Sequence, residues 1–235
     1  DFGTQLTPRL GVIYKLTDTS VLKALYGQSF RAANAVEVGG TPFIMGNPDI
    51  EPEELDTYEL VYLKQTHDAR YEVTLFHNDL TNGIISAAGQ FQNVSESKSR
   101  GIELSYSKKF SKFSLESSAS YVKNKDVTNN TKYYAFPKYI VNLGLGYDFP
   151  QNWTLFVSNR IHLDARENTT TNAPELKDYW RVDVNLRKTV NKQLQIFANI
   201  INALNRNNYL PPLGSTEGGI PENDIRLDAG FIYKF

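Results

Sequence analysis

Apolar and polar residues alternate one by one along most of this chain, and this pattern constrains the fold more than any other feature of the sequence. Side chains of an extended strand point to opposite faces in turn, so each alternating segment predicts a strand with one apolar and one polar face. The alternation is clearest near 102–106, 141–147, 180–186 and 194–200. Helical spacing is not sustained anywhere, and turn-forming residues separate the segments. We therefore expect an all-β fold.

About eleven such segments follow one another, each of roughly the length that a tilted strand needs to cross a membrane. They lie near residues 6–16, 21–30, 55–65, 70–80, 100–110, 113–125, 138–149, 153–166, 179–189, 193–201 and 224–235. The connections between them alternate in length. Short turns lie near 17–20, 66–69, 111–112, 150–152 and 190–192, and long polar stretches lie near 31–54, 81–99, 126–137, 167–178 and 202–223.

The alternation of short and long connections helps to distinguish between two possible all-β folds. A soluble sandwich has no reason to place every long loop at one end, whereas a bacterial outer-membrane barrel has short periplasmic turns and long external loops. Aromatic residues also gather at the expected strand ends, as the interfacial girdles of a membrane barrel require. These residues are Tyr106, Phe110, Phe113, Tyr147, Phe149, Trp153, Tyr179 and Trp180. The sequence favours a transmembrane antiparallel up-and-down β-barrel over a sandwich.

The expected strand count indicates that part of the barrel lies outside this sequence. Single-chain bacterial barrels have an even number of strands, and this chain supplies about eleven. If the short turns mark the periplasmic side, the first strand runs inward and the last one ends in the periplasm. The absent part then contributes an odd number of strands. The chain also begins on strand-like sequence without an initiating Met, which indicates a fragment or a processed product.

Composition argues against several other functions. The 235-residue chain has a formal net charge of -1, which gives no electrostatic case for binding nucleic acid. It has no Cys, so disulfides, thiol catalysis and Cys-ligated zinc are excluded. The sequence contains no nucleophile elbow, HExxH pair or phosphate-binding loop. We therefore expect no enzyme, no metal site and no cofactor.

Four motifs, in order along the chain, resemble those of a known family. The first joins Phe30-Arg31-Ala32 to Asn47-Pro48-Asp49-Ile50-Glu51-Pro52-Glu53 across a long loop. The second is the strand entry from Asn93 to Tyr106, and the third runs from Asn199 to Tyr209. The last is the ending Asp228-x-Gly230-x-x-Tyr233-x-Phe235, which matches the signal that the outer-membrane assembly machinery reads. Together these motifs resemble those of the TonB-dependent outer-membrane receptors.

This resemblance implies a barrel of 22 strands with a plugged lumen, of which residues 1–235 would be the C-terminal half. The plug domain, the segment that contacts TonB and the first half of the barrel would lie outside this sequence. The family implies TonB-coupled uptake of a scarce nutrient complex, above all a ferric siderophore, with cobalamin, haem and glycans as other substrates. A passive porin-like or adhesin barrel without TonB coupling remains an alternative.

The same resemblance implies a place and a set of partners. The place is the bacterial outer membrane. The partners are outer-membrane lipid, the remainder of the receptor, TonB acting through the plug, the nutrient chelate and the outer-membrane assembly machinery.

Candidate substrate contacts come from two parts of the chain. The long connections supply Arg31, Phe43, Met45, Tyr133 and Tyr134. The inward phase of two neighbouring strands supplies Arg160, His162 and Arg181. Aromatic side chains give a large contact area at low entropic cost, and arginine offers planar bidentate donors to an anionic ligand. Packing of the loops on one another, or a hydrated and salt-bridged barrel wall, is the alternative interpretation.

Haem is the substrate that the resemblance favours least. Receptors of this family that take haem usually place a ligating His in the loop between Phe-Arg-Ala and Asn-Pro, since ferric haem iron binds imidazole well. Here that loop, from Ala33 to Gly46, has no His, and Met45 is its only soft ligand. A Met ligand, or a His from the absent half, remains an alternative.

The terminal alternation generates a prediction about membrane assembly. We expect Phe235→Ala to lower the amount of folded receptor in the outer membrane more than it lowers substrate affinity, because the last aromatic residue belongs to the assembly signal. Quantification of surface receptor in cells, alongside substrate binding to the purified fraction, measures both effects. Normal surface levels of the variant would contradict the prediction.

Overall fold

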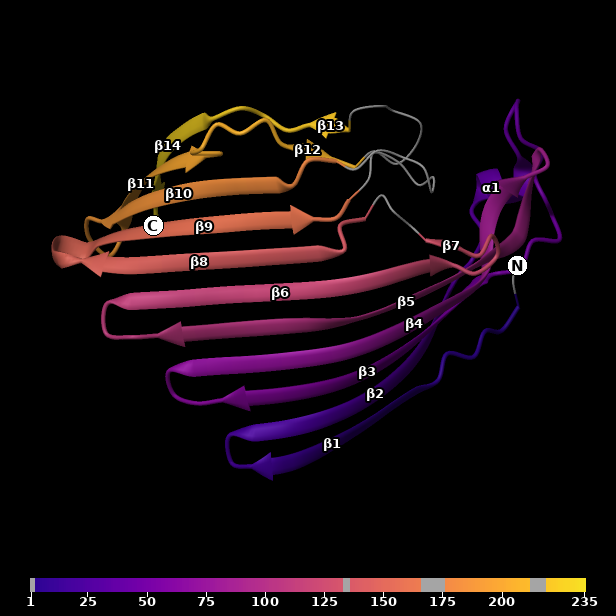
Figure 1. Cartoon of the computed structure of the whole chain (residues 1–235), viewed down its shortest axis with the longest axis horizontal. Helices are drawn as coiled ribbons and strands as arrows, with labels where there is room; N and C mark the ends of the chain where they lie inside the picture. Colours follow the sequence, from indigo (N-terminus) through magenta and orange to yellow (C-terminus); the bar gives the residue numbers. More distant parts are fainter. Residues whose placement is uncertain (1–2, 133–135, 166–175, 212–218) are drawn as a thin grey trace. The chain divides into compact units, whose positions relative to one another are not determined.

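The computed structural model describes residues 3–132, 136–165, 176–211 and 219–235. Eleven strands form one sheet in their order along the chain, and the short β7 pairs only with β6 (Figure 1). The strands of this sheet are β1 (Arg9–Thr17), β2 (Ser20–Arg31), β3 (Glu53–Gln65), β4 (Ala69–Ala87), β5 (Gln90–Lys109), β6 (Phe113–Asp126), β7 (Thr131–Lys132), β8 (Tyr139–Phe149), β9 (Trp153–Leu163), β10 (Tyr179–Thr189), β11 (Leu194–Ile201) and β14 (Arg226–Tyr233). The predicted up-and-down order is therefore confirmed.

The remaining elements are small. Helix α1 (Ala35–Gly39) lies between β2 and β3, and the 3-10 turn η1 (Pro150–Asn152) joins β8 to β9. Strands β12 (Tyr209–Leu210) and β13 (Ile220–Pro221) form a separate two-stranded sheet. Among the residues that the structure describes, no helix is long and apolar enough to span a membrane.

The chain divides into two compact units. The first consists of Asp1–Tyr62, Thr74–Ile102 and Val122–Tyr133, and so contains β1, β2, α1, the start of β3, the end of β4, the start of β5, the end of β6 and β7. The second consists of Leu63–Val73, Glu103–Tyr121 and Tyr134–Phe235, and so contains the short turns of β3 to β6 and all strands from β8 onward.

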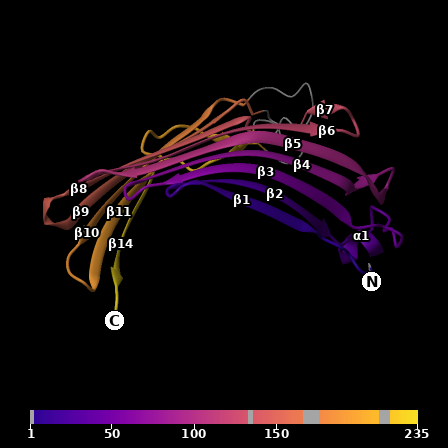
Figure 2. The same cartoon turned by 90° about the horizontal axis from the view of Figure 1, so that it is seen from below.

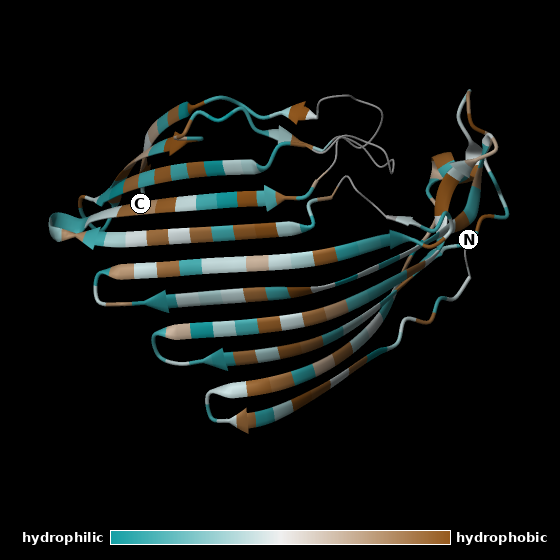
Figure 3. Ribbon diagram, in the orientation of Figure 1, coloured by the Kyte–Doolittle hydropathy of each residue, from teal (hydrophilic) through white to brown (hydrophobic). Residues whose placement is uncertain are grey.

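Within the second unit, pairing across strands sorts side chains onto two faces. Strands β8, β9, β10, β11 and β14 lie side by side in that order (Figure 2). Arg160 of β9 pairs with Asn142 on one side and Arg181 on the other, and these residues define the polar face. The next residue, Ile161, pairs with Val141 and Trp180, which define the apolar face. Hydrophobic and hydrophilic bands alternate along the strands accordingly (Figure 3).

The apolar face is exposed, and the sheet has almost no interior. The buried hydrophobic residues in the described part of the chain are only Ile50, Val61, Ala69, Ile84, Ala165 and Tyr179. Large side chains of the apolar face are exposed, among them Leu145 (49 %) and Phe231 (71 %). A protein in water rarely leaves such an apolar surface uncovered. An exposed apolar face of this extent is typical of a surface that meets an apolar partner.

Aromatic rings of the apolar face cluster near both ends of the strands. Close to the short turns, the ring centroids of Phe113 and Tyr147 lie 4.6 Å apart, and those of Tyr147 and Phe149 lie 4.5 Å apart. Toward the long connections, Tyr121 and Tyr139 lie 5.2 Å apart. Two levels of aromatic residues are what interfacial girdles require. Tyr179 is an exception to the predicted girdle, because it belongs to the polar face and is only 3 % exposed.

One predicted loop is wrong. The stretch 81–99 was expected to be a long connection, but β4 continues to Ala87 and β5 begins at Gln90. A tight turn joins them at Ala88 and Gly89, which both have positive φ angles (50° and 79°), as a hairpin turn of two residues demands. The apolar residues of this segment do not alternate regularly: Ile84 and Ile85 are adjacent and fall on opposite faces, so the pattern by which a strand is recognised is missing.

Close backbone approach at Gly46 leads to a prediction. A Cβ added to Gly46 would overlap the backbone of Val38 and Gly40, whereas a Cβ on Gly39 would meet no described atom within 4 Å. We expect Gly46→Ala to destabilise the loop after α1 by about 1–3 kcal/mol, because this is the usual cost of adding a methyl group where no space is left. Hydrogen exchange at the Met45 amide, which donates to Gly89, measures this local opening. Gly39→Ala is the matched control, and equal effects of the two variants would contradict the prediction.

Candidate functional site

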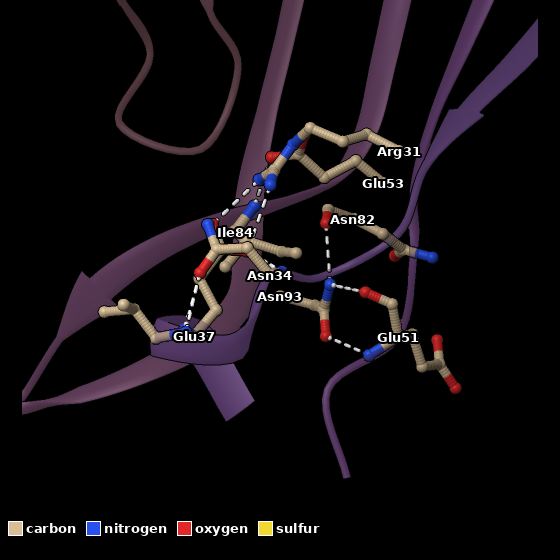
Figure 4. A network of polar contacts seen from close by, with 9 residues as sticks. Arg31, Asn34, Glu37, Glu51, Glu53, Asn82, Ile84 and Asn93 are labelled. Carbon is tan, nitrogen blue, oxygen red and sulfur yellow. Dashed lines mark hydrogen bonds and ion pairs between the residues drawn. The ribbon is translucent and has the colours of Figure 1, made fainter. Parts of the chain in front are cut away.

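The first long connection begins with an ion-pair clamp around Arg31, the last residue of β2. Its two terminal nitrogens Nη1 and Nη2 each donate to one carboxylate oxygen of Glu37 at 3.0 Å. Its Nε donates to Glu53 at the start of β3. Arg31 thus joins the outgoing strand, helix α1 and the returning strand through one guanidinium group (Figure 4). Such bidentate, charge-assisted bonds fix geometry as well as charge.

Helix α1 is held by a capping box that shares the same carboxylate. The side-chain oxygen of Asn34 accepts hydrogen bonds from the backbone N–H groups of Val36 and Glu37, and Glu37 in return accepts the backbone N–H of Asn34 at 2.8 Å. Glu37 is only 8 % exposed. Its pKa lies below the ordinary value, first because Arg31 donates to the carboxylate and also because the Asn34 N–H does, while burial acts in the opposite direction.

The end of the connection is fastened to the neighbouring hairpin. Glu53 accepts the backbone N–H of Ile84 in β4 at 2.8 Å. The side chain of Asn93 in β5 accepts the N–H of Glu51 at 2.7 Å and donates to the carbonyls of Glu51 and Asn82 at 2.8 and 2.7 Å (Figure 4). The half-buried amide of Asn93 thus supplies the hydrogen bonds that strand pairing would otherwise give to the backbone of Glu51 and Asn82.

The loop that follows α1 presents apolar side chains on this rigid support. Met45 forms a parallel bridge with Gln90 at the tip of the β4–β5 hairpin: its N–H donates to Gly89 and its carbonyl accepts from Phe91, at 2.8 and 3.1 Å. Phe43 is 93 % exposed and Met45 64 % exposed. Both side chains are therefore available for contact, while the backbone that carries them is fixed.

The second group of predicted residues lies on the polar face of β9 and β10. The rings of His162 and Tyr179 stack with centroids 4.6 Å apart and an interplanar angle of 16°. The hydroxyl of Tyr179 donates to Glu222 at 2.7 Å, and Arg181 donates to Glu222 at 2.6 Å and to Asp183 at 3.0 Å. The charge of Arg181 is thus shared between two carboxylates of this chain.

Two buried asparagines hold the segment that carries Glu222. Asn208 accepts the backbone N–H of Trp180 at 3.0 Å and donates to its carbonyl at 3.1 Å, so its amide acts as a strand partner. Asn202 donates to the carbonyls of Arg206 and Asn223, and its own N–H donates to Asp183. Sequence reasoning assigned neither asparagine a role, although both fall within the Asn199–Tyr209 motif that carried part of the family resemblance.

Arg160 lies apart from this network, beside a hollow of about 640 Å³ on the polar face. Side chains of β5, β6, β8 and β9, most of them small or polar, line the hollow together with Asp183. Phe156 also lines it, and its ring occupies the space over Gly144 where a Cβ would otherwise stand. The structure therefore brings His162 and Arg181 into one network and places Arg160 at the edge of an open polar surface.

The remaining predicted residues have simpler positions. Tyr133 and Tyr134 lie outside the described residues. Gly230 in β14 pairs with Phe197 in β11, whose ring lies where a Cβ of Gly230 would be. The rings of Tyr233 and Phe235 meet edge to face at 5.3 Å, and Phe235 is fully exposed. The described part of the chain contains no group of three or more His, Asp or Glu residues that could hold a metal ion.

Comparison with known proteins identifies the family of this exposed, two-faced sheet. The model of the family described as "TonB dependent receptor-like, beta-barrel" matches residues 1–203. The chain belongs to this family, and the family predicted from the four motifs is confirmed.

Several relatives and solved structures resemble the chain in part. The vitamin B12 transporter BtuB of Vibrio cholerae is 27 % identical over 106 residues, which is 44 % of this chain and 17 % of that protein. The siderophore receptor PirA of Acinetobacter baumannii has a TM-score of 0.81 at 16 % identity, and the match covers 97 % of this chain and 41 % of that chain. The copper transporter OprC has a TM-score of 0.81 at 15 % identity, with 97 % and 39 % covered. The chain therefore spans less than half the length of each.

The depressed pKa of Glu37 gives a pH prediction for the clamp. A carboxyl group with a lowered pKa in the folded state adds stability above its ordinary pKa, near 4.5, and loses that stability as the pH falls from there through the folded value. We expect hydrogen-exchange protection of residues 34–47, corrected for intrinsic rates, to be retained at pH 6 and to fall below about pH 4.5. Glu37→Gln should weaken protection at pH 6 and flatten this acid dependence. If protection in Glu37→Gln falls with acid as steeply as in the wild type, the prediction is contradicted.

Proposed function

We propose that this chain is the C-terminal half of the β-barrel of an outer-membrane receptor that takes up a scarce nutrient complex by TonB coupling. Membership of the TonB-dependent receptor family supports the proposal. The observation that carries it is the two-faced sheet, with large apolar side chains exposed on one face and Asn142, Arg160 and Arg181 on the other. A wall between lipid and a polar lumen needs this distribution.

The protein would work as one part of a larger assembly. The plug domain, the segment that contacts TonB and the first half of the barrel would complete the receptor, and β1 and β14 would pair with strands of that other half. The terminal residues Gly230, Tyr233 and Phe235 would serve as the signal to the outer-membrane assembly machinery. No covalent change of the substrate is needed in such a transporter, so we propose transport and not catalysis.

A ferric siderophore is the substrate that we propose first. A structure with the same fold is named a siderophore receptor, PirA. Phe43 and Met45 offer exposed apolar contacts on a fixed backbone, and Arg160 offers positive charge on the polar face. Arg31 and Arg181 each engage two carboxylates of this chain, so in our proposal each positions the residues around it within its own unit and contacts a ligand less directly.

Cobalamin is the second candidate, because the vitamin B12 transporter BtuB matches 44 % of this chain. A passive porin-like or adhesin barrel would lack energy coupling altogether. Uptake of radiolabelled ferric siderophores and of cyanocobalamin by cells that express the complete receptor separates these possibilities. Uptake that stops when TonB is deleted supports the proposed function, and TonB-independent diffusion of both compounds would overturn it.

The exposed loop after α1 gives a prediction about binding. We expect Phe43→Ala to weaken substrate binding to the complete receptor by about 1–3 kcal/mol, as at other interface hot spots, without a change in folded receptor. Phe110→Ala, which removes an exposed phenylalanine beside a short turn, is the matched control. Equilibrium binding to purified receptor measures both variants. If Phe43→Ala and Phe110→Ala bind substrate equally well, the site lies elsewhere.

A further inference from the structure

The segment after α1, all of it in the first unit, folds into two tight turns. In the first turn the Thr41 hydroxyl accepts the N–H groups of Phe43 and Ile44 at 3.3 and 3.0 Å, and the Thr41 N–H donates to the Ile44 carbonyl at 2.8 Å. The second turn begins at Asn47, whose side chain accepts the Asp49 N–H at 3.0 Å. The turns present Phe43 and Asp49 as exposed residues on a fixed backbone.

Two anchors on β5 hold this segment from both sides. The backbone of Met45 bonds to Gly89 and Phe91, and the backbone of Glu51 bonds to the side chain of Asn93. Phe91 and Asn93 are one step of two residues apart on the same strand, which is about 7 Å. Exposed apolar and acidic residues are therefore carried together on one short, fixed piece of chain. We call its exposed side chains the loop surface; they are Phe43, Met45, Asp49 and Glu51.

The two carboxylates of the loop surface take no part in holding the fold. The hydrogen bonds that fix Asp49 and Glu51 use their backbone atoms. Neither carboxylate forms a hydrogen bond or an ion pair with any residue that the structure describes. The Glu51 carboxylate points away from Asn93 and from the clamp around Arg31 (Figure 4). Both negative charges are therefore available to a partner from outside the chain.

The clamp adds to this negative charge. Its one guanidinium group, that of Arg31, meets the carboxylates of Glu37 and Glu53. The pKa of Glu37 lies below its ordinary value because Arg31 donates to the carboxylate, so Glu37 stays charged at neutral pH. Together with Asp49 and Glu51, four carboxylates stand against one cation. The clamp and the loop surface therefore carry an excess of three negative charges.

Cations that follow along the chain do not offset this excess. The two segments that build the surface, residues 32–63 and 71–97, contain no Lys or Arg. Lys98 comes next along β5, but it stands five residues from Asn93, so its side chain lies on the opposite face of the strand. It also pairs with Asp79 at 3.2 Å. Its charge is therefore directed away from the loop surface.

The cations of β6 and β7 in this unit share the face of Lys98. The Val127 N–H donates to the Glu96 carbonyl at 2.9 Å, which places Lys125 opposite Lys98 in the antiparallel ladder. Lys132 pairs with Lys125, so it lies on the same face. Two further cations stand two residues from Lys98 and Lys125 and have the same phase. They are Arg100 and Lys123.

The face of the clamp has its next cation at Arg9 of β1. Arg9 pairs with Gly27, which is four residues from Arg31 along β2, or about 13 Å. Lys15 and Lys23 lie still further along these strands, toward the short turn. No cation of the described first unit therefore neutralises the loop surface at close range.

An exposed aromatic ring on the same segment as free carboxylates favours a cationic ligand. The face of an aromatic ring attracts positive charge, and Phe43 is 93 % exposed. Met45 adds an adaptable apolar contact. An anionic ligand would instead meet an excess of negative charge, and such like-charge contacts suppress binding. The loop surface therefore fits a ligand that combines apolar groups with a positive charge.

We propose that the loop surface selects a ferric chelate that carries a positive charge, namely a trihydroxamate complex with a free ammonium group. Three hydroxamate anions neutralise the ferric ion in such a complex, so the ammonium group sets its net charge. A tris-catecholate complex carries three negative charges and would be disfavoured. This selection rests on the siderophore uptake of the proposed function and specifies its charge. Arg160 belongs to the other unit, and its charge does not enter the count.

The test is binding of matched ferric chelates to the complete, folded receptor, measured by titration calorimetry. Ferrioxamine B is the cationic chelate, and its N-acetyl derivative is the neutral one, which differs only at the amine. We expect wild type to bind ferrioxamine B about three- to 30-fold more tightly than the N-acetyl derivative, and ferric enterobactin more weakly than either. In the double variant Asp49→Asn, Glu51→Gln the preference for the cationic chelate should fall to about twofold or less.

A matched control removes the same charge elsewhere. The double variant Asp18→Asn, Glu96→Gln neutralises two exposed carboxylates, one in a short turn and one on the face of Lys98, and should keep the wild-type preference. Equal loss of preference in both double variants, no loss in either, or tighter binding of ferric enterobactin by wild type would overturn the proposal.

Salt gives a second measurement that needs no variant. The preference of wild type for the cationic chelate should shrink when the salt concentration rises from about 50 to about 500 mM, because exposed charges are screened. This measurement and the single variant Glu51→Gln decide if the double variant does not fold. A preference that does not change with salt would overturn the proposal.

Uptake by cells with and without TonB separates failure of this proposal from failure of the proposed function. TonB-dependent uptake of ferric enterobactin without uptake of ferrioxamine B overturns the charge selection alone. Binding of none of the three chelates also overturns it, and TonB-dependent uptake of cyanocobalamin would then leave coupled transport in place. Uptake that never depends on TonB would instead overturn the proposed function.

Discussion

Hydrogen bonding between neighbouring strands is the interaction on which the rest of this structure depends. A sheet with so few buried apolar residues draws little of its cohesion from an interior, so each strand is held chiefly by the ladder to the next. In hydrocarbon an unpaired backbone group costs several kcal/mol, which makes unbroken pairing compulsory wherever the sheet meets lipid. Irregular backbone occurs mainly in the connections, and also at single points within strands such as Asn82 of β4, which has a positive φ angle. Near such places, side chains such as Asn93 and Asn208 take over the hydrogen bonds that a neighbouring strand would provide.

This dependence explains which parts of the fold the sequence predicts. Where one face meets an apolar environment, period-two alternation marks the strand, and β8 and β10 were placed within one residue of their observed bounds. In the segment between residues 81 and 99, the adjacent Ile84 and Ile85 fall on opposite faces, and the alternation in polarity is lost. The outer parts of β4 and β5 therefore read as a loop, although backbone pairing continues to Ala87.

The sequence predicted which types of residue lie in the candidate site, but it did not predict which residues they contact. An arginine at the mouth of a loop and another on the inward face of a strand are both reasonable ligand contacts. Nothing local reveals that Arg31 meets Glu53, or that Arg181 meets Glu222 from a distant connection. Those pairings arise from how the connections fold back over the strand ends. Buried asparagines were missed for the same reason: a polar residue in a polar stretch gives no sign of burial, and only the Asn199–Tyr209 motif pointed toward Asn202 and Asn208.

The bridge between Met45 and Gln90 has a consequence for how such proteins diverge. The loop after α1 takes its position from the tip of a hairpin encoded some forty residues later, through backbone bonds that ignore side-chain identity. Substitutions on either side are therefore tolerated as long as the backbone path survives. Insertions and deletions are not independent: a longer β4–β5 hairpin carries its tip away from the loop, which must then lengthen by a similar amount to keep its support. The two connections should vary in length together, while their sequences drift apart freely.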